Sequence, residues 1–208
     1  MTFPNQLTLL RIFLTPIFIA TLFVQSLPYR YIAFFLFFIA SLTDWYDGYI
    51  ARKFGSVSKW GKFLDPLADK ILVLSAFVAF FFIGQVELWM VMVIAARDLV
   101  VTALRIYAMK KNNPLVTTTF AKWKTASQMA AIYIILIYLI IKQRMVDAAE
   151  PATWFQKIED ICLIDKMMYV VTLITATTGI HYLIENRQHV KGFAIAFCRL
   201  FLPTTFFS

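Results

Sequence analysis

Residues 43–70 read TDWYDGYIARKFGSVSKWGKFLDPLADK, and this stretch sets both the topology and the chemistry expected of the chain. It places two pairs of aspartates, Asp44 with Asp47 and Asp65 with Asp69, at the facing ends of two otherwise apolar segments. An aspartate near the centre of a membrane helix costs about 2.5 to 3.5 kcal/mol on insertion scales, and less near the interface. A chain that keeps four of them is therefore expected to use them.

The composition around this stretch is that of a membrane protein. Of the 208 residues, 61% are hydrophobic and 15% are charged, whereas soluble domains contain about a half and a quarter of these classes. Several apolar stretches approach the roughly 20 residues that cross a bilayer core. We therefore predict an all-α fold, with a single domain over residues 1–208 and six transmembrane helices. The expected spans are 7–27, 31–52, 63–84, 88–108, 120–141 and 165–185.

Basic residues differ between the loops. The loops after the second and fourth expected spans carry four Lys or Arg each, and the loop after the third carries none. The positive-inside rule then places these two basic loops and both termini in the cytoplasm. The net charge of +8 is assigned to this orientation and to contacts with anionic lipids or phosphorylated substrates, not to nucleic acid. The first apolar stretch lacks a basic leader, so we expect it to remain as a helix.

The spacing of the aspartates predicts a shared site. Asp44 and Asp47 are three residues apart and Asp65 and Asp69 are four apart, so each pair projects from one helix face. An antiparallel hairpin brings the two pairs to one depth. Four carboxylates this close repel one another unless cations are present. Oxygen ligands favour Mg²⁺ or Mn²⁺, and four carboxylates suit two metal ions of the kind that typically serve phosphoryl chemistry.

Small residues accompany the aspartates. Gly48 and Ala51 leave one helix face without bulk, and Gly61 does the same where the next helix begins. Such positions let a phosphorylated ligand approach the backbone closely. Tight helix packing is the alternative explanation, because small residues at this spacing also bring membrane helices together. Beside four aspartates, we favour the ligand.

A family signature matches this stretch at every position. Its two parts are Asp44-x-x-Asp47-Gly48-x-x-Ala51-Arg52 and Gly61-x-x-x-Asp65-x-x-x-Asp69, and they resemble the pattern of the CDP-alcohol phosphotransferase family. The resemblance implies a six-helix enzyme of the bacterial cytoplasmic membrane, commonly a homodimer, with its site toward the cytoplasm. It also implies transfer of a phosphatidyl group from CDP-diacylglycerol to an alcohol, with release of CMP and with two Mg²⁺ or Mn²⁺ ions.

The resemblance also implies roles for single residues. Asp44, Asp47 and Asp65 are expected to hold one metal ion, and Asp44, Asp65 and Asp69 the other. Asp69 is also the expected catalytic base, which removes the proton of the acceptor hydroxyl. The residues expected to contact the cytidine diphosphate portion are Thr8, Asp44, Gly48, Ala51, Arg52, Gly61 and Asp65.

Residues outside the signature bear on the acceptor. The opening PNxLTxxR, which contains Asn5, Thr8 and Arg11, resembles the phosphatidylglycerophosphate synthase branch, as do segments 96–105 and 122–128. That resemblance implies glycerol-3-phosphate as the acceptor, and a phosphate needs cationic partners. The residues predicted to bind it are Arg97, Arg105, Lys122 and Lys124. The alternative is that these cations neutralise an intramembrane acid or extend to lipid headgroups.

Two further readings stay open at this point. The same chemistry could serve another acceptor, namely phosphatidylglycerol, inositol phosphate or serine. Acidic and basic residues within spans also occur in ion or proton transporters, where they line a pathway across the membrane. A transporter should distribute its charges along the pore, whereas the aspartates here cluster at the ends of two spans. The pattern therefore favours the enzyme.

Overall fold

The computed structural model is a bundle of long antiparallel helices. It describes residues 3–54, 61–110, 119–148, 155, 159, 161–187, 190 and 192, although not the side chains at 3–7, 45, 47–54, 61–67, 69, 109–110, 119–122 and 148. The helices are α1 (Phe3–Phe23), α2 (Leu27–Phe54), α3 (Gly61–Phe82), α4 (Leu88–Lys110), α5 (Thr119–Ala148) and α7 (Leu163–Glu185). Within these described residues there is no strand, so the all-α prediction is confirmed.

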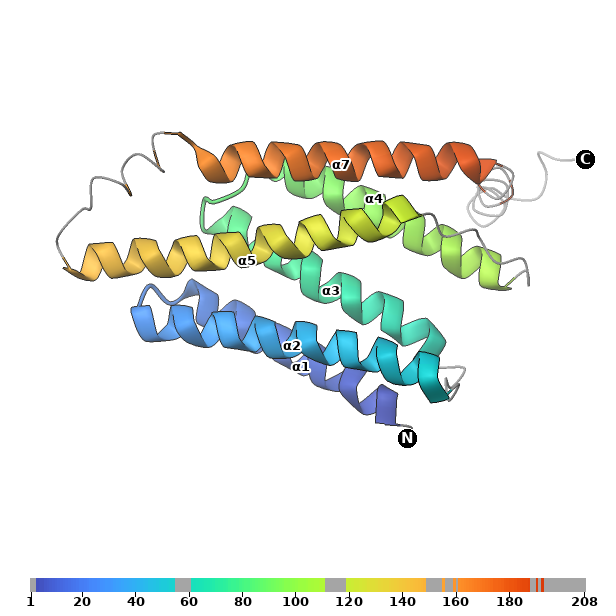
Figure 1. Cartoon of the computed structure of the whole chain (residues 1–208), viewed down its shortest axis with the longest axis horizontal. Helices are drawn as coiled ribbons and strands as arrows, with labels where there is room; N and C mark the ends of the chain where they lie inside the picture. Colours follow the sequence, from blue (N-terminus) through green and yellow to red (C-terminus); the bar gives the residue numbers. More distant parts are fainter. Residues whose placement is uncertain are drawn as a thin grey trace, which may run out of the picture.

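The helices alternate in direction, which gives the bundle two different ends (Figure 1). At one end α1 begins, α2 ends and α3 begins; we call this the signature end, because the described residues 43–54 and 61–70 lie toward it. At the opposite end, the far end, α1 and α5 end and α7 begins. Helix α1 packs against α2 and α3, α5 packs against α2 and α7, and α4 packs against α3 and α7.

Helix ends at the far end differ from the expected spans. The first span was expected to reach residue 27, but α1 ends at Phe23 and α2 begins at Leu27. Arg30 explains the turn, because its guanidinium donates a 2.7 Å hydrogen bond to the carbonyl of Leu22, which has no partner within its own helix. Pro28 lies in the first turn of α2, where a missing N–H costs nothing. The turn contains the polar residues Gln25 and Ser26 but no charged residue, so a prediction based on charge-free stretches places the break a few residues later.

Helix α3 also stops earlier than expected, at Phe82 instead of residue 84. The chain closes it with a Schellman motif: the N–H of Gly84 bonds to the carbonyl of Phe81, and that of Gln85 bonds to the carbonyl of Phe80. Gly84 has φ +78°, a left-handed conformation that glycine adopts without strain. The glycine therefore fixes where α3 ends and where the short connection to α4 begins.

The buried core changes character along the bundle. The inward face of α1 carries Thr8, Arg11 and Thr15 toward the signature end, and Phe18 and Leu22 toward the far end; all five are buried. The inward face of α5 likewise begins with Lys124 and Gln128 and continues as aliphatic residues. The core is thus polar toward the signature end and apolar toward the far end.

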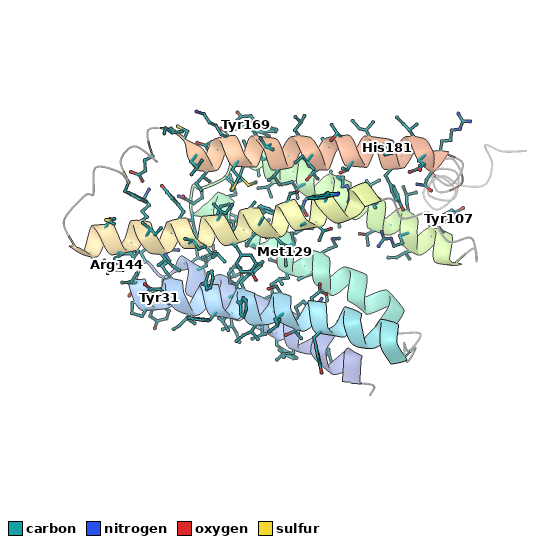
Figure 2. The ribbon with its side chains drawn as sticks, in the orientation of Figure 1. Tyr31, Tyr107, Met129, Arg144, Tyr169 and His181 are labelled. Atoms are coloured by element: carbon teal, nitrogen blue, oxygen red, sulfur yellow. The ribbon has the colours of Figure 1, made fainter. Side chains whose placement is uncertain are left out.

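The outer surface is apolar. Phe13, Phe82 and Leu173 are each at least 65% exposed, and Figure 2 labels further outer side chains such as Tyr31 on α2 and Tyr169 on α7. Two of the described helical segments, Trp123–Asp147 and Leu163–Glu185, are long and apolar enough to cross a membrane. Exposed apolar side chains around a partly charged core reverse the usual arrangement of a soluble domain.

Candidate active site

The backbone places the four signature aspartates on two helices that meet at one end. Asp44 and Asp47 lie in the last three turns of α2, and Asp65 and Asp69 lie in the first three turns of α3. The last turns of α2 and the first turns of α3 lie at the signature end (Figure 1). This arrangement is the one the predicted hairpin needs.

Not all of the predicted ligands can be followed to their side chains. The side chains of Asp47, Asp65 and Asp69 lie outside the described residues, so the grouping of four carboxylates stays a prediction. The same holds for the small and basic positions of the signature, which are Gly48, Ala51, Arg52 and Gly61. Among the side chains that are described, His, Cys, Asp and Glu form no group of three or more that could hold a metal ion.

Among the four signature aspartates, Asp44 has a described side chain, and this side chain forms an ion pair with Arg11. The Arg11 guanidinium lies 2.7 Å from Oδ1 of Asp44, and the Arg11 side chain is 2% exposed whereas that of Asp44 is 41% exposed. A buried guanidinium beside a carboxylate fixes the orientation of that carboxylate. An oriented and accessible carboxylate suits a ligand of Mg²⁺ or Mn²⁺. The described geometry therefore fits the predicted metal site at this residue.

Thr8 and Thr15 lie on the same face of α1 as Arg11. Both are buried, and the Thr15 hydroxyl donates a 2.8 Å hydrogen bond to the Arg11 carbonyl. Because α1 packs against both α2 and α3, this polar face lies against the helices that carry the aspartates. Thr8, which was predicted to contact the cytidine diphosphate portion, is thus on the correct helix face for that role.

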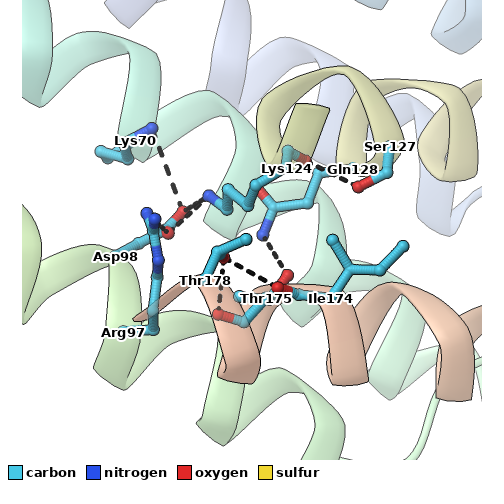
Figure 3. A network of polar contacts seen from close by, with 9 residues as sticks. All are labelled: Lys70, Arg97, Asp98, Lys124, Ser127, Gln128, Ile174, Thr175 and Thr178. Atoms are coloured by element: carbon cyan, nitrogen blue, oxygen red, sulfur yellow. Dashed lines mark hydrogen bonds and ion pairs between the residues drawn. The ribbon is translucent and has the colours of Figure 1, made fainter. Parts of the chain in front are cut away.

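A second group of charges surrounds Asp98 in the middle of α4. Asp98 is fully buried, and the Lys124 ammonium on α5 donates to both of its oxygens, at 2.5 and 2.6 Å. The guanidinium of Arg97 lies 3.3 Å from Oδ1 of Asp98, and the ammonium of Lys70, on α3, lies 4.0 Å from its Oδ2. Figure 3 shows the three cationic side chains converging on this one carboxylate from three helices. We call these four residues the Asp98 cluster.

Helix α7 makes room for the cluster. A Cβ atom at Gly179 would lie only 2.6 Å from Cγ of Arg97, so the Arg97 side chain passes where any larger residue would stand. One turn earlier, Thr175 accepts a 3.4 Å hydrogen bond from the Gln128 amide, which links α7 to α5 beside Lys124 (Figure 3). The Nε of Arg97 is buried and finds no hydrogen-bond acceptor among the described residues.

The four residues predicted to bind the acceptor phosphate do not all lie at one place in the structure. Arg97 and Lys124 come together at Asp98. Arg105 lies two turns further along α4, beside Tyr182 of α7, and not in the cluster. The side chain of Lys122 is outside the described residues. Of the predicted residues, the fold thus brings Arg97 and Lys124 together and keeps Arg105 apart from them.

Two members of the cluster were missed by the sequence prediction, namely Asp98 and Lys70. Asp98 lies within the expected fourth span, and the prediction gave it no role. Lys70 directly follows Asp69, and this position was a usable signal, because a cation next to the predicted base belongs to the same helix end. The pairing of Asp98 with Lys124 over 26 residues depends on how α4 and α5 pack, and no local pattern indicates it.

The chain belongs to the CDP-alcohol phosphatidyltransferase family, which matches residues 1–184. It is 33% identical over 201 residues to a CDP-diacylglycerol–glycerol-3-phosphate 3-phosphatidyltransferase of Bacillus subtilis (strain 168), covering 90% of this chain and 96% of the relative. A protein of the same name from Rickettsia bellii is 38% identical over 134 residues, or 64% of this chain and 74% of the relative. One from Haemophilus influenzae is 34% identical over 134 residues, or 62% and 72%. The resemblance predicted from the signature is confirmed.

Proposed function

We propose that the protein transfers the phosphatidyl group of CDP-diacylglycerol to glycerol-3-phosphate, which forms phosphatidylglycerophosphate and releases CMP. Its family membership and the shared name of its relatives support this activity. The observation that carries the proposal is the position of Lys70. This residue follows Asp69, the predicted base, and also lies beside the Asp98 cluster's other cations. One stretch of α3 can therefore serve both the hydroxyl and the phosphate of the acceptor.

The signature aspartates form the metal site in this proposal. Asp44, Asp47 and Asp65 hold one divalent ion, and Asp44, Asp65 and Asp69 hold the second, each being Mg²⁺ or Mn²⁺. Family membership supports a divalent metal requirement, and the accessible Asp44 carboxylate beside Arg11 fits a ligand. When bound, such ions neutralise the diphosphate and stabilise the charge that develops on the leaving oxygen.

The side chains of the chain divide the remaining work. Asp69 removes the proton of the acceptor hydroxyl, and the resulting oxygen attacks the phosphorus that carries the diacylglycerol. The bond from this phosphorus to the CMP oxygen breaks, and CMP leaves. Arg11 acts as a positioning residue, because it holds Asp44 from the buried side. The residues that contact the cytidine diphosphate portion are Thr8, Asp44, Gly48, Ala51, Arg52, Gly61 and Asp65.

The proposed setting is a bacterial cytoplasmic membrane. We place the helices of the bundle as six spans of one domain, with the signature end and both termini toward the cytoplasm and a second copy of the chain completing a homodimer. Three features support the membrane setting: the apolar outer surface, the two long apolar segments and the alternating helix directions. The charged core at the signature end also supports it, since buried charges in membrane helices face the protein interior.

The acceptor is tested by CMP release from the purified protein in detergent micelles with CDP-diacylglycerol and Mg²⁺. Glycerol-3-phosphate, phosphatidylglycerol, inositol phosphate and serine are supplied one at a time. We expect CMP with glycerol-3-phosphate and none above background with the other three. CMP with a different acceptor would keep the chemistry and overturn the acceptor, whereas folded protein that releases no CMP with any of them would contradict the enzyme proposal.

A further inference from the structure

The cations that the acceptor needs are already gathered around one internal anion. Asp98 and Lys124 are no more than 1% exposed, and the Arg97 side chain is 10% exposed. A lysine five residues after the start of a membrane helix would ordinarily extend its ammonium to the aqueous interface. Lys124 instead turns into the bundle and donates to both oxygens of Asp98. Its position is therefore set by Asp98.

We propose that Asp98 is a positioning residue for the acceptor: it assembles Lys70, Arg97 and Lys124 into a binding site for a phosphate monoester before the acceptor arrives. This inference rests on the proposed function, and it deepens it by naming what makes the enzyme select a phosphorylated acceptor. Buried cations repel one another, so bringing them together without an anion is costly. When Asp98 is present, the folded protein already holds the cations together. Their mutual repulsion therefore does not reduce the affinity for the ligand.

The charge and the hydrogen-bond inventory support a ligand at this cluster. The cluster sets three basic side chains, Lys70, Arg97 and Lys124, against one acidic side chain, Asp98. A phosphate monoester supplies close to two negative charges at neutral pH. The buried Nε of Arg97 lacks an acceptor among the described residues, and such a group is costly unless something pairs with it. A phosphate oxygen is the acceptor this arrangement fits.

The alternative is that Asp98 only neutralises Lys124. A buried ion pair can exist without function, and removing one partner destabilises the protein in either case. The two explanations differ in kinetics. A structural pair affects the amount of folded enzyme, whereas a positioning residue changes the affinity for the phosphorylated acceptor and not the affinity for CDP-diacylglycerol.

Asp98→Asn separates these explanations, because it keeps the shape of the side chain and removes its charge. We expect the KM for glycerol-3-phosphate to rise about tenfold or more, the loss typical of one charge-assisted contact, with the KM for CDP-diacylglycerol within about twofold of wild type. The ratio of kcat/KM for glycerol-3-phosphate over glycerol should fall by a similar factor, since glycerol lacks the phosphate. A folded variant with an unchanged KM for glycerol-3-phosphate would overturn the proposal.

The variant could also fail to fold, because it leaves Lys124 buried and unpaired. The double variant Asp98→Asn/Lys124→Gln removes that unpaired charge and is expected to recover thermal stability. A wild-type KM for glycerol-3-phosphate in this double variant would overturn the proposal, and a KM raised about tenfold or more supports it. The matched control is Lys142→Gln/Glu159→Gln, which removes an ion pair of 2.9 Å between Lys142 of the same helix α5 and Glu159 beyond its end, with both side chains at least 40% exposed. It should leave both KM values unchanged.

A binding measurement distinguishes failure of this inference from failure of the proposed function. The thermal stabilisation of wild type and Asp98→Asn by inorganic phosphate, without CDP-diacylglycerol, requires no turnover. The wild type should be stabilised at phosphate concentrations about tenfold or more below those that the variant needs. Equal concentrations for the two proteins would contradict the role of Asp98 even if wild type releases CMP with glycerol-3-phosphate. If wild type needs less phosphate than Asp98→Asn but releases no CMP, the proposed function is contradicted and the role of Asp98 in phosphate binding is not.

Discussion

Helix α5 carries one ion pair at each end of the bundle, and the two pairs are built differently. Lys124 and Asp98 meet in the polar core near the signature end, where both are almost fully buried. Lys142 and Glu159 meet at the far end, where both are about 40% exposed. Hydrogen bonds from Lys142 and from the Tyr138 hydroxyl hold the pKa of Glu159 below its usual range. The chain thus keeps a buried ion pair, which is costly to desolvate, near the signature end, and a solvated pair, which is not, at the far end.

Two arginines that are buried among the described residues, Arg11 and Arg30, repeat this contrast. Arg30, near the far end, donates to the carbonyl of Leu22 and closes the turn between α1 and α2. Arg11, near the signature end, instead pairs with a partly exposed carboxylate that no turn requires. Burial alone therefore does not mark a functional cation in this protein. What marks it is a partner that faces an accessible site.

The largest expected effect breaks the buried pair and spares the exposed one. Lys124→Gln should lower the free energy of unfolding by about 3–5 kcal/mol, because it leaves Asp98 buried without its bidentate partner. Lys142→Gln should lower it by no more than about 1 kcal/mol, since its pair is solvated. Thermal or denaturant unfolding in the same detergent measures both. Equal losses in the two variants would remove the distinction between the ends of α5.

A smaller effect is expected where α7 makes room for Arg97. Gly179→Ala places a methyl group within 2.6 Å of Arg97 Cγ, near the base of that side chain, so Arg97 or the helix must shift. We expect a destabilisation of about 1–3 kcal/mol, together with a raised KM for glycerol-3-phosphate. Thr177→Ala, two residues earlier at an exposed position, is the control and should change neither. A silent Gly179→Ala would mean that Arg97 is not held where the structure places it.

The smallest of these effects separates the two arginines. Arg11→Lys keeps the charge but loses the planar geometry that holds the Asp44 carboxylate. The Mg²⁺ concentration for half-maximal activity should therefore rise about tenfold, the low end of the loss seen when a ligand's support is removed. Arg30→Lys should leave that concentration unchanged and cost about 1 kcal/mol of stability. A metal requirement that shifts equally in both variants would contradict a specific role for Arg11.

Sequence patterns predict the helices well because apolar length is a local property. The turn between the first two helices was expected at residues 28–30 and lies at 24–26, since the charge-free stretch runs through it and the charge of Arg30 follows only inside α2. The signature predicted the family and placed the aspartates on two helices that meet at one end. Local spacing is enough for this, because the two helices are neighbours along the chain.

Contacts between distant helices lie beyond such patterns. The pairing of Arg11 with Asp44 and that of Asp98 with Lys124 each join residues at least 26 positions apart on different helices. Gly179 appears in the sequence as an ordinary small residue of an apolar stretch, yet it makes room for Arg97. These features follow from helix packing, which sets neighbours that periodicity cannot specify. The predicted roles of Asp47, Asp65 and Asp69 stay predictions, because their side chains lie outside the described part of the chain.

In the proposed function, the aspartates at the signature end perform the chemistry. The most direct measurement compares CMP release by wild type, Asp69→Asn and Asp147→Asn, with CDP-diacylglycerol, glycerol-3-phosphate and Mg²⁺. Asp147 is an exposed aspartate at the end of α5, far from the signature end, and serves as the matched control. We predict a loss of at least about 10²-fold in kcat for Asp69→Asn, as for removal of a general base, and no loss for Asp147→Asn. Retention of wild-type kcat by folded Asp69→Asn would contradict the account.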